Sequence, residues 1–218
     1  MGKLIVFEGV DGSGKSTQYK LLCDRLKRQG ISFRSLVFPR YSEPSSALIR
    51  MYLAGEFGDK PGDVNAYAAS AFFAVDRYAS YVQDWREFYL NGGLVVTDRY
   101  TTSNAVHQAS KLPPEEREGF LHWLFEFEYR YMGLPAPDLV LFVDVDLSTS
   151  LAHLRKRESE TDTSADIHER DNVYLDASIS AARTAAKLYN WRRLDGSASV
   201  EEIAEQVAEE VEMLWKRS

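Results

Sequence analysis

The segment that most constrains the fold is a glycine-rich loop near residue 10. Residues 4–17 read Leu-Ile-Val-Phe-Glu-Gly-Val-Asp-Gly-Ser-Gly-Lys-Ser-Thr, so four apolar residues precede the spacing Gly9-x-x-x-x-Gly14-Lys15-Ser16. A leucine-rich helical pattern follows directly. Strand, glycine loop and helix in this order are typical of a phosphate-binding loop (P-loop), because glycines let consecutive backbone N–H groups turn toward one anion at a helix N-terminus. The sequence therefore predicts a nucleoside triphosphate site.

Each part of this loop has an expected role. Lys15 is expected to reach the β- and γ-phosphates, and the Ser16 hydroxyl to ligate Mg²⁺. Asp11 is unusual, since a carboxylate beside a triphosphate costs electrostatic energy. It either accepts a hydrogen bond from a sugar hydroxyl of a second substrate or faces solvent. The residues predicted to bind ATP are Gly9, Val10, Asp11, Gly12, Ser13, Gly14, Lys15, Ser16 and Thr17.

Composition narrows the class of protein. The chain has 218 residues, 44% of them hydrophobic, which suits a single α/β domain over 1–218. A net charge of −7 argues against general binding to nucleic acid or to anionic membranes. The single Cys23 excludes an internal disulfide and a cysteine-rich zinc site. Apolar runs are far shorter than a membrane span, and the early first strand leaves no room for a signal peptide, so a cytoplasmic location is expected.

Short apolar runs alternate with helical patterns along the whole chain. This alternation predicts an α/β fold of the P-loop NTPase type, with a doubly wound five-stranded parallel sheet flanked by helices. Ligands bind such sheets beyond the carboxyl ends of the strands, where charged residues follow four of these runs. The predicted strands lie at 4–7, 36–38, 94–97 and 139–145, with a weaker one near 191–194.

Three helical patterns are long enough to place. Apolar residues at steps of three and four predict one helix over 63–90, which the sequence Asn-Gly-Gly at 91–93 ends. A second helix is predicted over 114–133, with proline in its first turn. The last helix opens with Ser199-x-x-Glu202, a capping box.

One segment breaks the alternation. Arg155-Lys156-Arg157 is followed by a polar stretch to Asp166 without large apolar residues. A basic cluster beside such a stretch is typical of a flexible lid over phosphates, here at about 155–168. It is equally typical of a solvated surface loop.

Several residues beyond the P-loop are candidates for the same site. Asp98 ends an apolar run, an arrangement that holds Mg²⁺ directly or through water, and Arg99 adds a positive charge or forms a structural ion pair. Phe38 is either a base-stacking ring or a core residue. Asp76 and Arg77, adjacent in the long helix, either face a cleft or form a surface ion pair.

Taken in order, these motifs resemble the thymidylate kinase family, whose members phosphorylate dTMP with ATP. The ordered matches run through nearly the whole chain, from residue 3 to about 195. The matching segments are Phe-Glu-Gly-Val-Asp-Gly-Ser-Gly-Lys-Ser-Thr at 7–17, Phe-Pro-Arg-Tyr at 38–41, Phe-Ala-Val-Asp-Arg-Tyr at 73–78, Asp-Arg-Tyr-Thr-Thr-Ser-Asn at 98–104, Gly-Leu-Pro-Ala-Pro-Asp at 133–138 and Asp-Ile-His-Glu-Arg-Asp at 166–171.

The resemblance implies an activity and its partners. It implies transfer of a phosphoryl group from ATP to dTMP, giving dTDP and ADP in dTTP synthesis. It also implies Mg²⁺ as cofactor, held by Ser16 and Asp98, ATP as co-substrate and a homodimer. Members of the family bind small-molecule nucleotides, and neither nucleic acid nor a membrane is expected as a partner.

The resemblance also assigns residues to the second nucleotide. Phe38 is implied to stack on thymine, Arg77 to hydrogen-bond the pyrimidine edge and Asp11 to bind the 3′-hydroxyl. The resemblance further implies that four residues surround the monophosphate and sugar, namely Arg40, Tyr41, Arg99 and Asn104. The positions of His107 and His168 are implied to flank the sugar and base. His107 and His168 stand where some relatives carry tyrosine, and each is either a site residue or a surface residue.

The cations implied to act in catalysis come from two places. Some relatives carry arginine in the P-loop, where this chain has Gly12 and Ser13, so the chain resembles members whose lid supplies the cation. Arg155 and Arg157 are implied to contact the γ-phosphate, and Arg170 is a further candidate for this contact. The implied catalytic residues are Lys15, Arg99, Arg155 and Arg157.

Two other functions remain open at this point. A deoxynucleoside kinase acts on an uncharged 5′-hydroxyl and needs a nearby base, for which Glu8 is available. A non-catalytic P-loop module that senses ATP would not need Asp11, Phe38, Arg77 and Asn104 together. Comparing the turnover of thymidine with that of dTMP distinguishes a deoxynucleoside kinase from a dTMP kinase. ATP binding without phosphoryl transfer to any pyrimidine nucleotide favours the ATP-sensing module.

Overall fold

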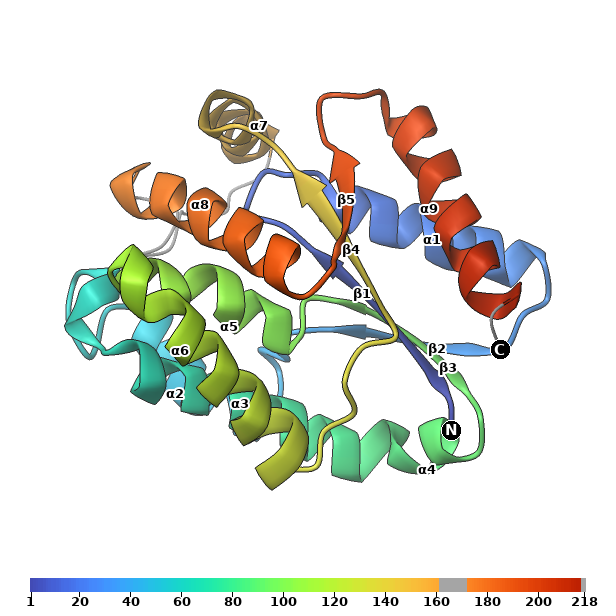
Figure 1. Ribbon diagram of the computed structural model, residues 1–218, viewed down its shortest axis with the longest axis horizontal. Coiled ribbons are helices and arrows are strands. Elements are labelled where there is room, and N and C mark those ends of the chain that lie inside the picture. The colour runs from blue at the N-terminus through green and yellow to red at the C-terminus, as the bar shows by residue number, and fades with distance from the viewer. Residues whose placement is uncertain (161–171, 217–218) are drawn as a thin grey trace.

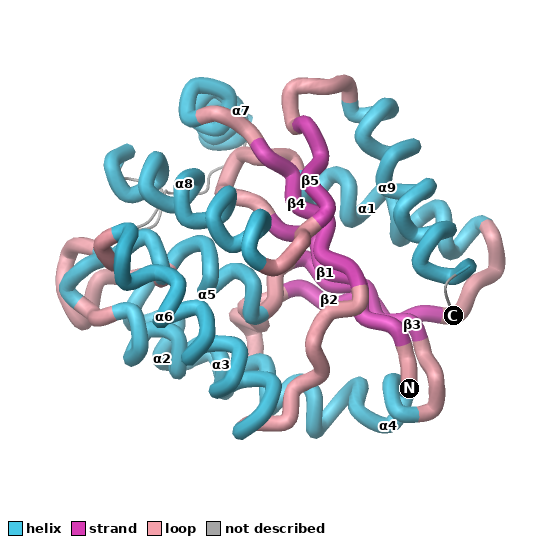
Figure 2. The backbone as a smooth tube through the Cα atoms, in the orientation of Figure 1, coloured by secondary structure: helices cyan, strands magenta, loops and turns pink. Residues whose placement is uncertain are grey.

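The computed structural model describes residues 1–160 and 172–216, and at its centre lies a parallel β-sheet (Figures 1 and 2). The five strands in the described part run in the order β2-β3-β1-β4-β5, which places β1 in the middle between β3 and β4. This confirms the predicted fold class. The strands are β1 (Lys3–Glu8), β2 (Phe33–Val37), β3 (Leu94–Asp98), β4 (Leu139–Asp144) and β5 (Arg192–Asp195).

The second strand begins earlier than predicted. It starts at Phe33 rather than at residue 36. The prediction missed this start because Leu36 is the one buried residue of the strand. At this edge of the sheet the other side chains are partly or fully exposed, so no continuous apolar run marks the strand. The central strands are buried on both faces, and their observed bounds agree with the predicted ones to within one residue.

Helices cover both faces of the sheet (Figure 1). On one face α1 (Lys15–Arg28) packs beside α9 (Val200–Lys216). Two further helices, α2 (Ala47–Leu53) and α7 (Leu147–Glu160), accompany the segments that follow β2 and β4. The helices of the other face are α3 (Ala66–Ser80), α4 (Arg86–Leu90), α5 (Thr101–His107), α6 (Pro114–Phe125) and α8 (Asn172–Leu188).

The core divides along the sheet because successive side chains of a strand point to opposite faces. Ile5 and Phe7 pack with Leu22 of α1 and Val207 of α9, whereas Leu4 and its neighbours on the other face pack against the larger helical layer. Each such apolar side chain contributes about 1.5–3 kcal/mol when it is fully buried. None of the described helices has both the length and the apolar character needed to cross a bilayer.

The predicted helix over 63–90 is observed, with one irregular turn inside it. It begins at Ala66, where the Asn65 side chain caps it by accepting a hydrogen bond from the Ala68 N–H at 2.9 Å. The π-helical turn Tyr81–Trp85 joins α3 to α4 and buries Trp85 completely. A π turn adds a single residue to the helical repeat, so apolar steps of three and four do not reveal it.

The other two predicted helices are also present. The helix over 114–133 is α6 followed by a second π-helical turn, Glu126–Tyr131. The capping box of α9 forms, since Ser199 Oγ donates to Glu202 Oε2 at 2.7 Å and the Glu202 N–H donates to Ser199 Oγ at 3.2 Å. Within the predicted lid, residues 155–160 form the end of α7, and 161–168 lie outside the described residues.

Candidate functional site

A cleft of about 1010 Å³ lies at the carboxyl ends of the strands. Segments that follow all five strands contribute to its walls, so residues far apart in the sequence meet where parallel α/β sheets bind ligands. Most of the predicted site residues are among its lining: Asp11, Gly12, Ser13, Gly14, Lys15, Ser16, Thr17, Phe38, Tyr41, Arg77, Asp98, Arg99, Asn104, His107 and Arg157.

The P-loop has the backbone that its glycines predict. Gly14 directly precedes α1 with a left-handed φ of 89°, so the N-terminus of that helix faces the cleft. Gly12 has a φ of 76°, and a Cβ there would collide with the Ser150 carbonyl of α7. Gly9 and Val10 are buried behind the loop and do not line the cleft among the described residues.

Lys15 lies inside the cleft and is almost fully buried. Its Nζ donates to the Val10 carbonyl at 3.3 Å and lies 3.6 Å from Asp11 Oδ1. Burial, and after it the positive charge of Arg99, lower the pKa of Lys15, while the carboxylates of Asp11 and Asp98 oppose this change. The lysine is therefore a poorly hydrated cation whose charge an added phosphate would stabilise.

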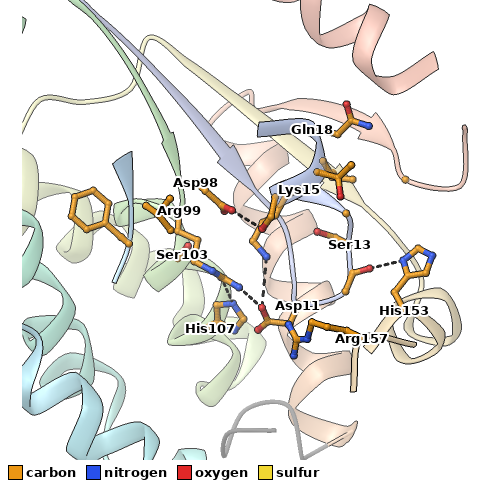
Figure 3. Close-up of a pocket in the computed structure, with 18 of the residues that line it drawn as sticks. Asp11, Ser13, Lys15, Gln18, Asp98, Arg99, Ser103, His107, His153 and Arg157 are labelled. Atoms are coloured by element: carbon orange, nitrogen blue, oxygen red, sulfur yellow. Dashed lines mark hydrogen bonds and ion pairs between the residues drawn. The ribbon is translucent and has the colours of Figure 1, made fainter. Parts of the chain in front are cut away.

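Arg99 links the P-loop to the next wall of the cleft. Figure 3 shows its guanidinium between Asp11, to which Nη2 donates, and His107, whose Nε2 lies 3.1 Å from Nη1. Burial works against the charge, but the carboxylates of Asp11, Glu8 and Asp98 outweigh it and raise the pKa of Arg99 above its ordinary value. Arg99 is thus a permanent cation held in a fixed orientation.

The backbone of Arg99 is strained in a way that sets this orientation. Its φ of 69° lies in the left-handed region, which costs a non-glycine residue about 1–3 kcal/mol. Thr97 Oγ1 donates to the Arg99 carbonyl at 2.8 Å and the Arg99 N–H donates to the Phe7 carbonyl at 3.0 Å. These bonds hold the turn after β3 and direct the guanidinium into the cleft.

Ser16 and Asp98 meet at the predicted metal position. Ser16 Oγ donates to Asp98 Oδ2 at 2.6 Å, and Asp98 Oδ1 is buried with no hydrogen-bond partner among the described residues. An orphaned carboxylate oxygen beside a hydroxyl fits a hard cation such as Mg²⁺. The described residues hold no group of three or more His, Cys, Asp or Glu side chains that suits a metal. A cation here would therefore need ligands in addition to Ser16 and Asp98.

The side of the cleft away from the P-loop is built on a buried arginine. Arg77 is 2% exposed, and its Nε and Nη2 donate to Glu128 at 2.7 and 2.5 Å. Its Nη1 donates to the Tyr100 carbonyl at 3.3 Å. Asn104 lines the cleft beside it and is also buried. The alternative that Asp76 and Arg77 form a surface ion pair is wrong, because both are buried.

Arg40, which was predicted to bind the second nucleotide, is paired with a buried carboxylate. Its backbone N–H donates to Asp76 Oδ2 at 2.8 Å, its Nε lies 3.4 Å from Asp76 Oδ1, and its Nη2 donates to Ser45 Oγ at 3.1 Å. It does not line the cleft among the described residues. Asp76 is almost completely buried, so it requires a positive partner, and Arg40 supplies it.

One face of α7 carries the basic residues that reach the cleft. Ser150 Oγ donates to the Asp11 carbonyl at 2.6 Å and His153 Nδ1 lies 2.7 Å from the Gly12 carbonyl, so this helix is docked on the P-loop. Lys156 and Arg157 line the cleft, and Figure 3 shows Arg157 extending from α7 toward the loop. Arg155 does not line the cleft. It precedes Arg157 by two positions on the helix, and a step of two residues turns the side chain by about 200° around the helix axis.

The remaining predicted residues have different surroundings. Phe38 belongs to the core and also lines the cleft, so base stacking stays a prediction. Tyr41 is 53% exposed at the cleft. His107 is 6% exposed, so it is not a surface residue. His168 and Arg170 lie outside the described residues.

Sequence reasoning missed one buried acid and two parts of the cleft. Glu128 sits between Phe127 and Tyr129 in a helical segment, and an acid flanked by aromatic residues was the available signal. Gln18 and the segment 196–200 also line the cleft, beyond β5. The capping box at Ser199 marks the start of a helix and not a ligand site, and Gln18 carries no motif, so the sequence does not assign either of them to the cleft.

Comparison with known proteins agrees with this geometry. A model of the family described as "Thymidylate kinase" matches residues 7–207. The chain is 39% identical over 110 residues to the thymidylate kinase of Mycobacterium tuberculosis (strain ATCC 25618 / H37Rv), which covers 50% of each chain. It is 33% identical over 111 residues to the thymidylate kinase of Plasmodium falciparum (isolate 3D7), covering 51% of this chain and 50% of that protein.

These alignments span about half the length of the curated relatives that the chain matches. The family model, in contrast, covers most of this chain and includes the P-loop, Arg77, Arg99 and Asn104. The chain therefore belongs to the thymidylate kinase family.

Proposed function

We propose that this protein transfers the γ-phosphoryl group of ATP to dTMP, giving dTDP and ADP for dTTP synthesis. The observation that supports this most directly is the link between the two sides of one cleft. Arg99 pairs with Asp11 of the P-loop, and the carbonyl of the next residue, Tyr100, accepts a hydrogen bond from Arg77 on the other side. The names of the matched relatives support the same activity.

The chemistry requires little from the protein except positioning and charge. The acceptor phosphate of dTMP is already anionic near neutral pH, so no strong general base is needed. The two nucleotides repel each other, and fixed cations must hold them in line. Lys15, Arg99 and Arg157 all line the cleft and supply such cations. Phe38, Arg77 and Asn104 would hold the thymine, and Asp11 the 3′-hydroxyl.

Mg²⁺ would be held by Ser16 and Asp98, which already share a hydrogen bond in the cleft. The bound ion would supply positive charge that offsets part of the negative charge of the ATP phosphates. The hydrogen bond from Ser16 Oγ to Asp98 Oδ2, 2.6 Å long, places the two oxygen donors side by side. The protein supplies two oxygen ligands and leaves the other positions to phosphate and water.

The deoxynucleoside kinase alternative is less well supported. Glu8, the available base, is fully buried and does not line the cleft among the described residues. Its carboxylate accepts hydrogen bonds from the Gly9 N–H at 2.9 Å, Thr102 Oγ1 at 2.6 Å and Ser103 Oγ at 2.8 Å. With its carboxylate held by these three donors and outside the lining of the cleft, Glu8 is not placed to take a proton from a 5′-hydroxyl.

The ATP-sensing alternative leaves part of the site without a use. A module that only binds ATP needs the P-loop and the face formed by α1. It does not need a buried arginine and asparagine on the other side of the cleft, where polar groups are costly to bury. Arg77 and Asn104 are therefore better explained by a second nucleotide.

A coupled assay tests the proposed activity. Purified protein, ATP and Mg²⁺ are combined in turn with dTMP, dUMP, dCMP, UMP and thymidine, and ADP release is followed with the product identified by chromatography. We expect dTDP as the main product and the highest kcat/KM for dTMP. Thymidine turnover without dTMP turnover would favour the deoxynucleoside kinase, and ATP binding with no acceptor at all would favour the ATP-sensing module.

Arg157 and Arg155 form a matched pair for testing the basic end of α7. Arg157→Ala should lower kcat by about 10- to 100-fold and change KM for dTMP little, because a cation that meets the transferred phosphoryl group acts mainly in the transition state. Arg155→Ala, which removes a neighbouring charge directed away from the cleft, should leave both constants near wild type. A pure KM effect of Arg157→Ala would assign it to ground-state binding.

We also propose that the protein is a cytoplasmic homodimer. Support comes from α3, where Val75, Tyr78 and the following Val82 form an exposed apolar stripe at steps of three and four. Such a stripe is costly in water and is typical of a covered surface. The proposed location rests on the nucleotide substrates of the family.

A further inference from the structure

A buried carboxylate without an assigned role lies behind the nucleoside side of the cleft. Glu128 is fully buried and belongs to the π-helical turn Glu126–Tyr131. Its Oε1 accepts from Arg77 Nη2 at 2.5 Å and from Asn104 Nδ2 at 3.2 Å, and its Oε2 accepts from Arg77 Nε and Thr101 Oγ1, both at 2.7 Å. A buried carboxylate is stable only with such partners. Irregular π turns are frequent at functional sites.

The position of Glu128 fixes which end of the Asn104 amide meets the cleft. One Nδ2 hydrogen points to Glu128, and the other to the Ser70 carbonyl at 3.2 Å. The opposite orientation would bring the amide oxygen against a carboxylate and a carbonyl, which repel it. Asn104 lines the cleft, so the group that it has left for a ligand is the Oδ1 acceptor.

Glu128 fixes Arg77 in the same way. A guanidinium has five N–H groups in one plane. Two of them form the paired bonds to Glu128, and a third points to the Tyr100 carbonyl. The two that remain can only donate. A ligand at this side of the cleft therefore meets donors from Arg77 beside an acceptor from Asn104.

We propose that Glu128 is a positioning residue that fixes Arg77 as donor and Asn104 as acceptor and so selects thymine-like over cytosine-like pyrimidines. Thymine carries a carbonyl oxygen beside a ring N–H, which complements this pair of groups. Cytosine carries an amine beside an unprotonated ring nitrogen, which opposes both of them. The inference rests on the proposed function and extends it to a residue that does not touch the nucleotide.

Glutamine at this position would weaken the selection for a specific reason. Its side chain has the size of glutamate, but its NH₂ group is a donor, and it would face one of the four donors that surround residue 128. Asn104 can respond by rotating its amide through half a turn, at the cost of turning Oδ1 toward the Ser70 carbonyl. That rotation would present Nδ2 to the cleft, where it could bond the ring nitrogen of cytosine.

The test compares wild type, Glu128→Gln and Glu126→Gln with dTMP and dCMP. Glu126 is a matched control, because it lies in the same π turn but is exposed and pairs with Arg130. In E128Q we expect KM for dTMP to rise about tenfold with kcat within about threefold, and the ratio of kcat/KM for dCMP to that for dTMP to rise at least about tenfold. E126Q should match wild type.

The outcomes separate this inference from the proposed function. Wild type that turns over neither nucleotide would overturn the proposed function, and this inference with it. Wild-type turnover of dTMP with an unchanged nucleotide ratio in E128Q, or an equal loss of kcat for both nucleotides, would overturn this inference alone. If E128Q does not fold, Thr101→Val removes one of the four hydrogen bonds and should shift the ratio less but in the same direction. An unchanged ratio in T101V would then overturn the inference.

Discussion

Replacing Lys15 with alanine should lower the rate of phosphoryl transfer by about a thousandfold or more while the protein remains folded. Lys15 Nζ is buried in the cleft between the Val10 carbonyl and Asp11, where its charge is poorly hydrated and therefore acts strongly on a phosphate. Alanine keeps the first turn of α1 because it is the best helix former. Single-turnover kinetics with saturating ATP and dTMP measure the transfer step directly.

The control for this prediction is Lys20→Ala. Lys20 is an exposed lysine of the same helix, so its removal changes the net charge equally but leaves the cleft intact. Thermal unfolding of both variants should show similar stabilities, since Asp11 keeps its ion pair with Arg99 when Lys15 is removed. Near-normal transfer by K15A would remove the P-loop lysine from the mechanism.

Much of this site follows from the sequence because the fold itself brings the residues together. Residues that follow β1 and β3 must meet at one edge of a parallel sheet, which is why Asp11, Ser16, Asp98 and Arg99 were predicted together and line one cleft. The glycine spacing similarly dictates the loop backbone. Such predictions depend on where each strand ends and on local backbone geometry, and both can be read from short segments.

The rest depends on contacts that a sequence pattern does not specify. Arg40 follows a strand like the other site residues, yet it pairs with the buried carboxylate of Asp76 and is not among the residues that line the cleft. Glu128 is separated from Arg77 by 51 residues and reaches it only through an irregular turn. Arg155 and Arg157 look equivalent in the sequence, and only the helical backbone of α7 distinguishes their directions. In these cases the ion pairs between distant residues, and the direction of each side chain on its helix, determine which residues reach the cleft.

Replacing Arg99 with glycine should cause the second large loss, about 10²- to 10³-fold in kcat, with little loss of stability. The φ of 69° at this position suits glycine, so the variant removes the guanidinium and relieves the backbone at the same time. What disappears is a permanent cation that is fixed between Asp11 and His107. Steady-state kinetics with dTMP, together with the free energy of unfolding in urea, measure the two effects.

Two further variants separate charge from geometry at this position. Arg99→Lys keeps the positive charge, but a single ammonium group cannot reproduce the planar fork that meets Asp11 and His107 together, so it should recover at most about tenfold of the lost rate. Arg99→Ala should be as inactive as the glycine variant yet less stable, because its Cβ retains the backbone strain. If R99K were fully active, charge alone would suffice and the fixed orientation of the guanidinium would have no part in catalysis. If R99G were active, the cleft would not use this cation at all.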